Sequence, residues 1–269
     1  MEYQSLDWII GVVQKTVQLL IDLGVNVIYN KELGKNITLE YINSNFDAAF
    51  ISIGANVPSK MNIPGEELKG VYGANLLLES GIHPNYEGKK VAVIGGGNVA
   101  MDAARTINKM GAKEVTVIYR RSREEMPAED KEIEDAEKEG IEFLYKTNIL
   151  KCISSENKDK VSKIECIKTE LVKKEGETRL SPVNIDGTNF ELDIDFVIMA
   201  VGAKADGNAI KDFIKNKWGN IEVDDNLRTS IKKVYAGGDI TGGKATVAFA
   251  ARAGRDAAYT IIEDLKEGT

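Results

Sequence analysis

The segment at residues 91–105, VAVIGGGNVAMDAAR, constrains the fold of this chain more than any other stretch. An apolar run typical of a buried strand leads into three glycines, and a helical pattern follows them. Gly95, Gly97 and Ala100 fit the G-x-G-x-x-G/A spacing. The first glycine permits a tight turn, the second lets a pyrophosphate approach the backbone, and a small third residue lets helix and strand pack closely. The segment therefore predicts the start of a dinucleotide-binding unit.

The neighbouring residues supply the context that such a turn requires. A strand is predicted over residues 90–94, a helix over 98–110 and a second strand over 114–119. A bare glycine pattern is a weak signal, whereas one between a strand and a helix is specific. Free N–H groups at the start of the helix would face the phosphates. We therefore expect six consecutive residues to line the site: Gly95, Gly96, Gly97, Asn98, Val99 and Ala100.

The residues after the second strand indicate which dinucleotide binds. A site for NAD carries an acidic residue about 20 residues beyond the glycines, where it bonds to the ribose 2′-hydroxyl. Here the strand VTVIY runs into Arg120, Arg121, Ser122 and Arg123. A guanidinium group at this place suits a 2′-phosphate, although exposed arginine pairs are also common surface features. We predict NADP(H) as the nucleotide.

Helix-like and strand-like segments alternate along the rest of the chain, which is typical of α/β proteins. Two phrases, DAAFISIGA and DFVIMAVGA, echo each other on either side of the glycine unit and indicate one α/β domain inserted in another. We expect further helices over residues 7–23, 37–42, 73–80, 128–140 and 247–265, and strands over 25–29, 47–55, 141–153, 160–174 and 191–203.

Composition and charge disfavour several classes of protein. The chain of 269 residues has a net charge of −7, which disfavours non-specific binding to nucleic acid. No apolar run reaches the ~20 residues that span a bilayer, and no signal-peptide pattern is present. The apolar stretch at residues 7–24 is interrupted by polar residues, so we expect an amphipathic helix packed on a core. A cytoplasmic protein is expected.

The chain has two cysteines, Cys152 and Cys166, which form neither a C-x-x-C pair nor a cluster of metal ligands. They could meet across a hairpin, but two buried, reduced strand residues are the simpler interpretation. His83, the one histidine, lies beside a proline in a polar linker and is expected to face solvent. The sequence predicts no metal site and no catalytic side chain.

The glycine segment and its surroundings resemble a known family. VAVIGGGNVAMDAARTINKMGAKEVTVIYRRSREEMPA is similar to the NADPH-binding segment of the glutamate synthase small (beta) subunit. Relatives include NADP-binding subunits of electron-bifurcating transhydrogenases and the NADPH half of dihydropyrimidine dehydrogenase. Residues 24–74 and the segment VYAGGDITGGKATVAFAARAGRDAA also resemble this family. The resemblance covers nearly the whole chain.

The resemblance implies an NADPH-dependent flavin oxidoreductase. In this family NADPH gives a hydride to N5 of FAD, and electrons leave one at a time through iron–sulfur clusters, in glutamate synthase toward a large subunit. Carried over, Asp239 would bond to the ribityl chain of FAD, and the N–H groups of Thr246 and Val247 would face the flavin, whose anion the helix dipole stabilises. Gly202 and Gly238, which follow strands, are also expected at the cofactors.

The resemblance also predicts the domain organisation. A Rossmann-type NADP(H)-binding domain at residues 86–200 would be inserted in a truncated FAD-binding domain formed by residues 1–85 and 201–269. Full members of the family begin with iron–sulfur segments and a first G-x-G-x-x-G for FAD, which this sequence lacks. Whether this chain alone binds FAD therefore stays open. We expect exposed apolar edges near the N-terminus, and association as a homo-oligomer or with a partner chain.

Other interpretations make different predictions. The chain could be an NADP(H)-binding module without flavin, completed by or docked to a partner chain. GGDITGGKAT nearly matches the phosphate-binding pattern G-x-x-x-x-G-K-[ST], but Ala245 replaces the hydroxyl residue that binds Mg²⁺. Tyr86 and Lys90 have the Y-x-x-x-K spacing of short-chain dehydrogenases but precede the glycine turn, so we attribute that match to chance.

Replacing Arg120 or Arg121 with alanine is expected to weaken NADPH binding about tenfold, because hydrogen bonds to charged groups contribute roughly 1.5–3 kcal/mol. NADH lacks the 2′-phosphate and should lose little affinity. Calorimetric titration of each variant with both nucleotides checks this. An equal loss for the two nucleotides, or no loss, would contradict the assignment.

Overall fold

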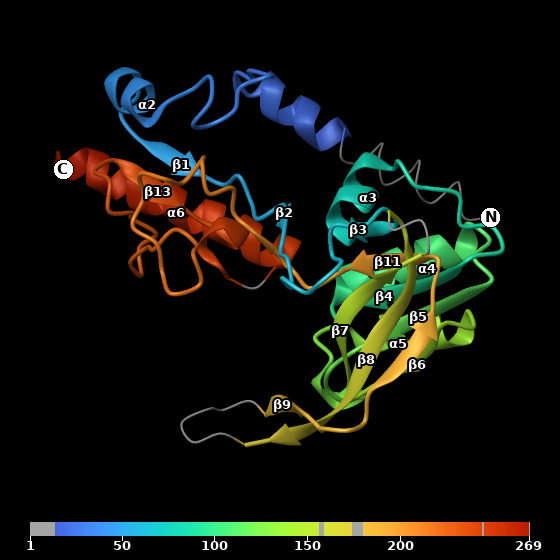
Figure 1. The fold of residues 1–269 in the computed structure, drawn as a ribbon. Coiled ribbons are helices and arrows are strands. Elements are labelled where there is room, and N and C mark those ends of the chain that lie inside the picture. Colours follow the sequence, from blue (N-terminus) through green and yellow to red (C-terminus); the bar gives the residue numbers. More distant parts are fainter. Residues whose placement is uncertain (1–13, 156–158, 174–179, 244, 269) are drawn as a thin grey trace.

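The structure is a computed structural model that describes residues 14–155, 159–173, 180–243 and 245–268. These residues form two lobes (Figure 1). The larger lobe contains a five-stranded parallel sheet and a four-stranded antiparallel sheet, and the smaller contains a two-stranded parallel sheet beside the long C-terminal helix. Helices connect the parallel strands, so the predicted α/β class is confirmed.

The parallel sheet has the strand order β3-β11-β4-β5-β6. The strand, helix and strand predicted around the glycine turn are confirmed to within one residue at each end. The strands of this sheet are β3 (Val71–Gly73), β11 (Phe196–Met199), β4 (Lys90–Ile94), β5 (Glu114–Ile118) and β6 (Glu142–Leu144). The helices between them are α3 (Ala74–Ser80), α4 (Asn98–Lys109) and α5 (Asp130–Lys138).

Both faces of the parallel sheet are apolar because both are covered. On one face Val91 and Val93 of β4 pack with buried residues of α3, α4 and α5. On the opposite face Ala92 and Ile94 pack with residues of the antiparallel sheet, such as Ile164. Successive side chains of a strand point to opposite faces. The continuous apolar run of β4 is therefore what a strand in the middle layer of three requires.

The antiparallel sheet is built on one long strand. β8 (Val161–Val172) pairs with β7 (Thr147–Ser154) and β10 (Phe190–Asp193) along its first part, and its end pairs with β9 (Ser181–Asn184). The paired ends of β8 and β9 project from the lobe (Figure 1). This sheet covers the face of the parallel sheet that the helices leave open.

The prediction of a single strand over residues 191–203 is wrong. The chain forms β10, antiparallel to β8, then turns and forms β11, parallel to β4. The carboxylate of Asp195 in that turn accepts a hydrogen bond of 2.9 Å from the amide of Lys90. Two strands of different sheets thus follow each other without a glycine or proline to mark the break.

The smaller lobe places the C-terminal helix beside a short parallel pair. β1 (Ala49–Ile51) pairs with β13 (Val234–Ala236), and the turn η2 (Gly238–Thr241) leads toward α6 (Val247–Glu267). A third apolar core lies here and includes Ile221 and Ile240. β2 (Val57–Pro58) and β12 (Ala203–Lys204) pair where the chain passes between the lobes (Figure 1).

The short helix predicted near residue 38 is confirmed as α2 (Leu39–Asn45), which Thr38 caps by accepting a 3.1 Å hydrogen bond from the amide of Tyr41. Residues 14–22 are also helical, in agreement with the prediction, and residues 7–13 of that prediction lie outside the described residues. The helix ends at Gly24, where φ is +94°.

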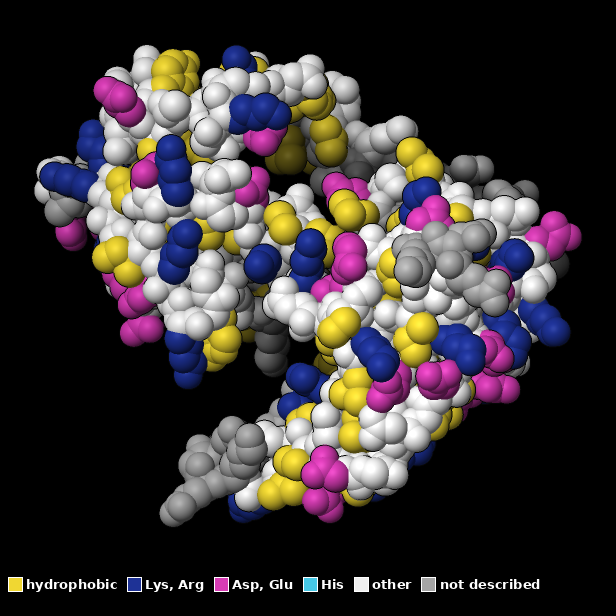
Figure 2. All heavy atoms as spheres, viewed as in Figure 1, with side chains coloured by type: hydrophobic (Ala, Val, Ile, Leu, Met, Phe, Trp, Pro, Cys, Tyr) yellow, Lys and Arg dark blue, Asp and Glu magenta, His cyan; other side chains and the backbone are white. Residues whose placement is uncertain are grey.

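Two expectations for the N-terminal segment are wrong. The helix at residues 14–22 does not pack on a core, since each of its residues is exposed. Residues 25–29 form no strand, because no described segment pairs with them. The exposed apolar surface expected near the N-terminus is present: Leu23 is 73% exposed and Ile28 is 64% exposed. Figure 2 shows hydrophobic side chains reaching the surface of both lobes.

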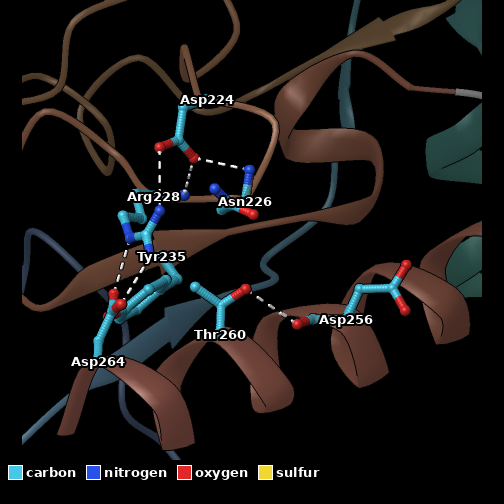
Figure 3. Close-up of polar contacts among 7 residues, drawn as sticks. All are labelled: Asp224, Asn226, Arg228, Tyr235, Asp256, Thr260 and Asp264. Carbon is cyan, nitrogen blue, oxygen red and sulfur yellow. Dashed lines mark hydrogen bonds and ion pairs between the residues drawn. The ribbon is translucent and has the colours of Figure 1, made fainter. Parts of the chain in front are cut away.

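A polar cluster anchors the end of α6 to β13 (Figure 3). The Nε and Nη2 atoms of Arg228 donate hydrogen bonds of 2.7 and 2.6 Å to the two carboxylate oxygens of Asp264. The buried Tyr235 donates its hydroxyl to the same carboxylate at 2.6 Å, and Asp224 binds Arg228 from the other side. These bonds lower the pKa of Asp264 from 3.8 to about 2, with Arg228 the larger cause.

This cluster predicts an acid-sensitive step in stability. Because the pKa of Asp264 is lowered in the folded state, its contribution is present above its ordinary value of 3.8 and is lost as the pH falls toward about 2. The Tm of the wild type should therefore fall between those pH values. Asp264→Asn should be less stable at neutral pH and should show a smaller fall in Tm over the same range.

Asp225→Asn is the matched control, because this exposed carboxylate has no hydrogen-bond partner among the described residues. It should reproduce the wild-type profile when Tm is followed by circular dichroism. An acid profile of Asp264→Asn that matches the wild type would contradict the assignment.

Candidate dinucleotide-binding site

The glycine turn after β4 is shaped by a close approach of two strand exits. Gly95 has φ of +146°, and a Cβ atom there would lie 2.2 Å from the carbonyl oxygen of Ala200, just beyond β11. The amide of Ala200 in turn donates a 2.8 Å hydrogen bond to Ile94. The tight turn predicted at Gly95 is therefore present, and a side chain is excluded there by backbone atoms.

Gly96 packs against an aromatic ring that the sequence did not single out. A Cβ atom on Gly96 would lie 2.6 Å from ring atoms of Tyr119, whose hydroxyl donates a 2.8 Å bond to the carbonyl of Glu125. The carbonyl of Gly96 accepts a 3.1 Å bond from the amide of Ala128. The side chain of Asn98 accepts a 3.0 Å bond from the amide of Glu129. The turn is thus braced by the segment before α5.

The start of α4 is open to a ligand. The carbonyl of Gly97 accepts hydrogen bonds from the amides of Ala100 and Met101, at 2.9 and 3.2 Å. The amides of Asn98 and Val99 have no hydrogen-bond acceptor within the described part of the chain, as expected for the first turn of a helix. A Cβ atom on Gly97 would meet nothing closer than Pro127, at 3.8 Å. Space therefore lies directly above this backbone.

Ala100 is fully buried in the core between α4 and the sheet, as its predicted packing role requires. Val99 is partly buried against the same core. Small residues continue along the inner face of the helix, with Ala103 and Ala104 also buried. The helix can therefore lie close to β4. Its N-terminus follows directly after the carboxyl end of that strand.

The three predicted arginines differ in what they contact. Arg120 is exposed, and no described carboxylate forms an ion pair with it. The Nε atom of Arg121 donates a 3.2 Å bond to the carbonyl of Leu180. Arg123, in the turn η1 (Arg123–Glu125), lies 3.6 Å from Asp130 and 3.7 Å from Glu137 of α5. Of the three, Arg120 is the one whose guanidinium has no hydrogen-bond or ion-pair partner among the described residues.

A second open site lies at the start of α6. A cleft of about 300 Å³ brings together the predicted residues Gly238, Asp239, Thr246 and Val247. Gly237 is the point of closest approach, since a Cβ atom there would lie 2.8 Å from the Cβ of Ala253 in α6. The Thr246 side chain accepts a 3.3 Å bond from the amide of Phe249 and so caps the helix. Sequence reasoning missed two lining residues that follow β1: Ser52 and Gly54.

Gly202 is not among the residues that line the cleft at α6. It follows β11 at the passage between the lobes, has φ of +97°, and accepts a 3.0 Å bond from the amide of Ser59. A Cβ atom there would meet nothing within 4 Å. The structure therefore places Gly202 at the pairing of β2 with β12.

Comparison with known proteins connects the two sites to one family. Residues 9–257 match the model of the pyridine nucleotide-disulphide oxidoreductase family. The chain belongs to this family. Its resemblance to the glutamate synthase small subunit is confirmed, since it is 32% identical to the NADPH small chain of that enzyme from Escherichia coli, with 93% of this chain and 57% of that one covered.

Other relatives of this chain are much longer. It is 38% identical to the beta subunit of an NADP(+)-dependent formate dehydrogenase from Moorella thermoacetica and 32% identical to the beta subunit of an NADPH-Fe(3+) oxidoreductase from Geobacter sulfurreducens. The alignments cover 92% and 95% of this chain but only 36% and 42% of those proteins. The chain thus spans well under half of the length of these two relatives.

Solved structures show the same fold. FprA from Mycobacterium tuberculosis, in complex with NADPH, superposes with a TM-score of 0.77 at 20% identity, covering 89% of this chain and 69% of FprA. Thioredoxin reductase from T. acidophilum gives 0.64 at 23% identity, with coverages of 81% and 65%. The predicted fold class, a flavoprotein fold with two dinucleotide-binding units, is confirmed.

The two cysteines of the chain are buried and free, as the simpler interpretation predicted. Burial raises the pKa of the Cys152 and Cys166 thiols to about 12, so both stay protonated at neutral pH. The described residues contain no cluster of His, Cys, Asp or Glu that could bind a metal ion. None of the helices in the described ranges is long and apolar enough to cross a membrane.

Tyr86 and Lys90 do not form a catalytic pair. Tyr86 is fully buried, which raises its pKa to about 12, whereas Lys90 pairs with Glu114 at 3.1 Å. The expectation that His83 faces solvent is wrong: it is partly buried, and its ring packs edge-on against Tyr86 at 5.9 Å. The phosphate-binding pattern at residues 238–245 lacks its hydroxyl residue, and Ala245 lies in the cleft beside α6.

Gly97→Ala separates ligand binding from folding. The added methyl group has room in the protein but occupies the space above the N-terminal amides of α4. We expect NADPH affinity to fall about tenfold or more, equivalent to ~1.4 kcal/mol, with little change in Tm. Gly95→Ala should instead lower Tm, because its Cβ would overlap Ala200. Calorimetry and thermal denaturation measure the two effects, and full NADPH affinity in Gly97→Ala would rule out phosphate binding at this turn.

Proposed function

We propose that this chain forms the NADPH-binding part of a flavin-dependent oxidoreductase. The observation that carries the proposal is the glycine turn at the exit of β4, with the unpaired amides of α4 above it and the exposed Arg120 at the exit of the adjacent β5. Parallel strands of this kind place ligands at their carboxyl ends. We propose residues 86–200 as the NADP(H)-binding domain, together with β3 and α3, which belong to its sheet and core, and the rest of residues 1–85 with 201–269 as parts of an FAD-binding domain.

Each group at the first site has a separate role in this proposal. The amides of Gly97, Asn98 and Val99 bind the pyrophosphate, where the positive end of the α4 dipole favours negative charge. Arg120 binds the 2′-phosphate, with Arg121 beside it. No acidic residue follows β5 before Arg123, so nothing at that place accepts a hydrogen bond from a free 2′-hydroxyl as in NAD sites.

The cleft at α6 fits one end of a flavin. The backbone at Gly237 lies too close to α6 for a side chain, and Gly238 has φ of +78°, which favours glycine. Glycine at both positions leaves a flat approach for a ring system. The carboxylate of Asp239 has no hydrogen-bond partner among the described residues and is available to a ligand hydroxyl. The N-terminal amides of α6 and its dipole would favour negative charge on the ring. A bound flavin would accept a hydride from the nicotinamide and pass electrons onward.

In this proposal the chain positions the nucleotide and one end of the flavin, and a partner receives the electrons. Two relatives are named as beta subunits and one as a small chain, which supports function within an assembly. We propose an iron–sulfur protein or a subunit like the glutamate synthase large chain as partner, or a second copy of the chain. Both free thiols fit a reducing compartment such as the cytoplasm.

A second candidate function is an NADP(H)-binding module without flavin. The observation that favours it is the absence of a first FAD fingerprint from this sequence, so the adenosine half of FAD has no evident site in it. In that case the cleft at α6 would be completed by a partner chain. The two candidates differ in whether the purified chain carries flavin.

A visible spectrum with a parallel calorimetric titration tests the proposal. We expect NADPH to bind more tightly than NADH, and added FAD to produce flavin absorbance on the protein that NADPH bleaches. Asp239→Asn should weaken flavin retention and leave NADPH binding unchanged, while Arg120→Ala should do the reverse. A colourless protein that binds NADPH would support the second candidate, and one that binds neither cofactor would overturn both.

A further inference from the structure

The two arginines after β5 form hydrogen bonds with three residues that lie far from them in the sequence. The hydroxyl of Thr169 donates a 2.8 Å bond to the carbonyl of Arg120, 49 positions away. The amide of Lys146 donates a 2.9 Å bond to the carbonyl of Arg121, and the Arg121 side chain donates to the carbonyl of Leu180. We refer to Lys146, Thr169 and Leu180 as the arginine brace.

Thr169 is the centre of this brace. It is 3% exposed, and its amide donates a 2.8 Å bond to the carbonyl of Lys146. Thr169 therefore connects Lys146 with Arg120 and Arg121, which we call the arginine turn. It lies where β8 stops pairing with β7 and starts pairing with β9, opposite Asn184. Removal of this buried hydroxyl would leave the carbonyl of Arg120 without its hydrogen-bond donor, which costs stability. The position of Arg120 therefore depends on this hydroxyl.

Lys146 adds a second sign that the turn is constrained. Its φ is +49°, in the left-handed region that side chains other than glycine rarely occupy. Such backbone strain persists where the surrounding structure fixes it. Here the bonds to Arg121 and Thr169 fix it from both sides. The brace thus holds the arginine turn in one conformation before any ligand arrives.

We propose that Thr169 is a positioning residue for recognition of the adenosine 2′-phosphate. This inference rests on the proposed NADPH function. The guanidinium of Arg120 is exposed and has no described partner, so the brace fixes its backbone rather than its tip. A fixed backbone reduces the ordering that Arg120 must undergo when it binds a phosphate. The β8–β9 pair, which carries Thr169, thereby becomes part of the element that distinguishes NADPH from NADH.

Thr169→Val is the test variant, because valine keeps the shape of threonine and removes the hydroxyl. Binding is measured by calorimetry on the whole chain, with adenosine 2′,5′-bisphosphate and 5′-AMP as probes that need no flavin. We expect the affinity for the bisphosphate to fall about fivefold and that for 5′-AMP to change less than about twofold, as for the loss of one hydrogen bond at the 2′-phosphate side.

Two further variants show whether the hydroxyl itself is responsible. Thr169→Ser keeps the hydroxyl and should restore the affinity for the bisphosphate. Thr260→Val is the matched control, since Thr260 is also buried and donates to a carbonyl, that of Asp256, at the other end of the molecule (Figure 3). It should lower Tm without changing the ratio of the two affinities. If Thr169→Val does not fold, Thr169→Ala, which leaves room for a water, replaces it and should show a smaller loss in the same direction.

The outcomes separate this inference from the proposed function. If the wild type shows no preference for the bisphosphate, or Arg120→Ala leaves that preference unchanged, the proposed NADPH site fails and this inference fails with it. If Arg120→Ala removes the preference while Thr169→Val keeps it, the inference about Thr169 alone is overturned. Equal weakening of both probes by Thr169→Val, or no recovery in Thr169→Ser, would also overturn it.

Discussion

The approach of Gly95 to the carbonyl of Ala200 is the contact on which the arrangement of both sites depends. A side chain at residue 95 would place a carbon atom 2.2 Å from that oxygen, so the exits of β4 and β11 can meet only with glycine there. The exit of β4 leads to the amides of α4, and the exit of β11 leads to β12 and the second lobe. One close contact thus sets the direction of the proposed phosphate site and of the chain that connects it to the α6 cleft.

The three layers of the larger lobe explain how the arginine turn comes to be held by a residue distant in sequence. The parallel sheet is covered by helices on one face and by the antiparallel sheet on the other. Because β8 crosses that second face and continues beyond it, its residue Thr169 arrives beside the exit of β5. The antiparallel sheet therefore does more than cover an apolar face, because the end of β8 reaches the residues proposed to select the nucleotide.

Local sequence pattern predicted the elements around the glycine turn, because the apolar run, the glycines and the helical period all agree there. It failed where tertiary contacts decide. Residues 25–29 include three β-branched residues, yet they form no strand, since no described segment offers a paired edge. The break between β10 and β11 has no glycine or proline to mark it and follows from pairing with two different sheets. At the α6 cleft, Gly238, Asp239 and Thr246 were predicted from a resemblance, whereas Ser52 joins them only because β1 pairs with β13.

The sequence by itself determined the chemistry available at the proposed nucleotide site. Glycines without side chains permit a phosphate to approach the backbone, and guanidinium groups after the second strand favour a phosphate over a hydroxyl. Only the tertiary structure decided which arginine is available. Arg123 lies 3.6 and 3.7 Å from two carboxylates of α5, and Arg121 donates a hydrogen bond to the carbonyl of Leu180. Arg120 is exposed, and its carbonyl accepts a hydrogen bond from Thr169, 49 residues away. These differences arise from contacts between segments distant in sequence, which no local pattern records.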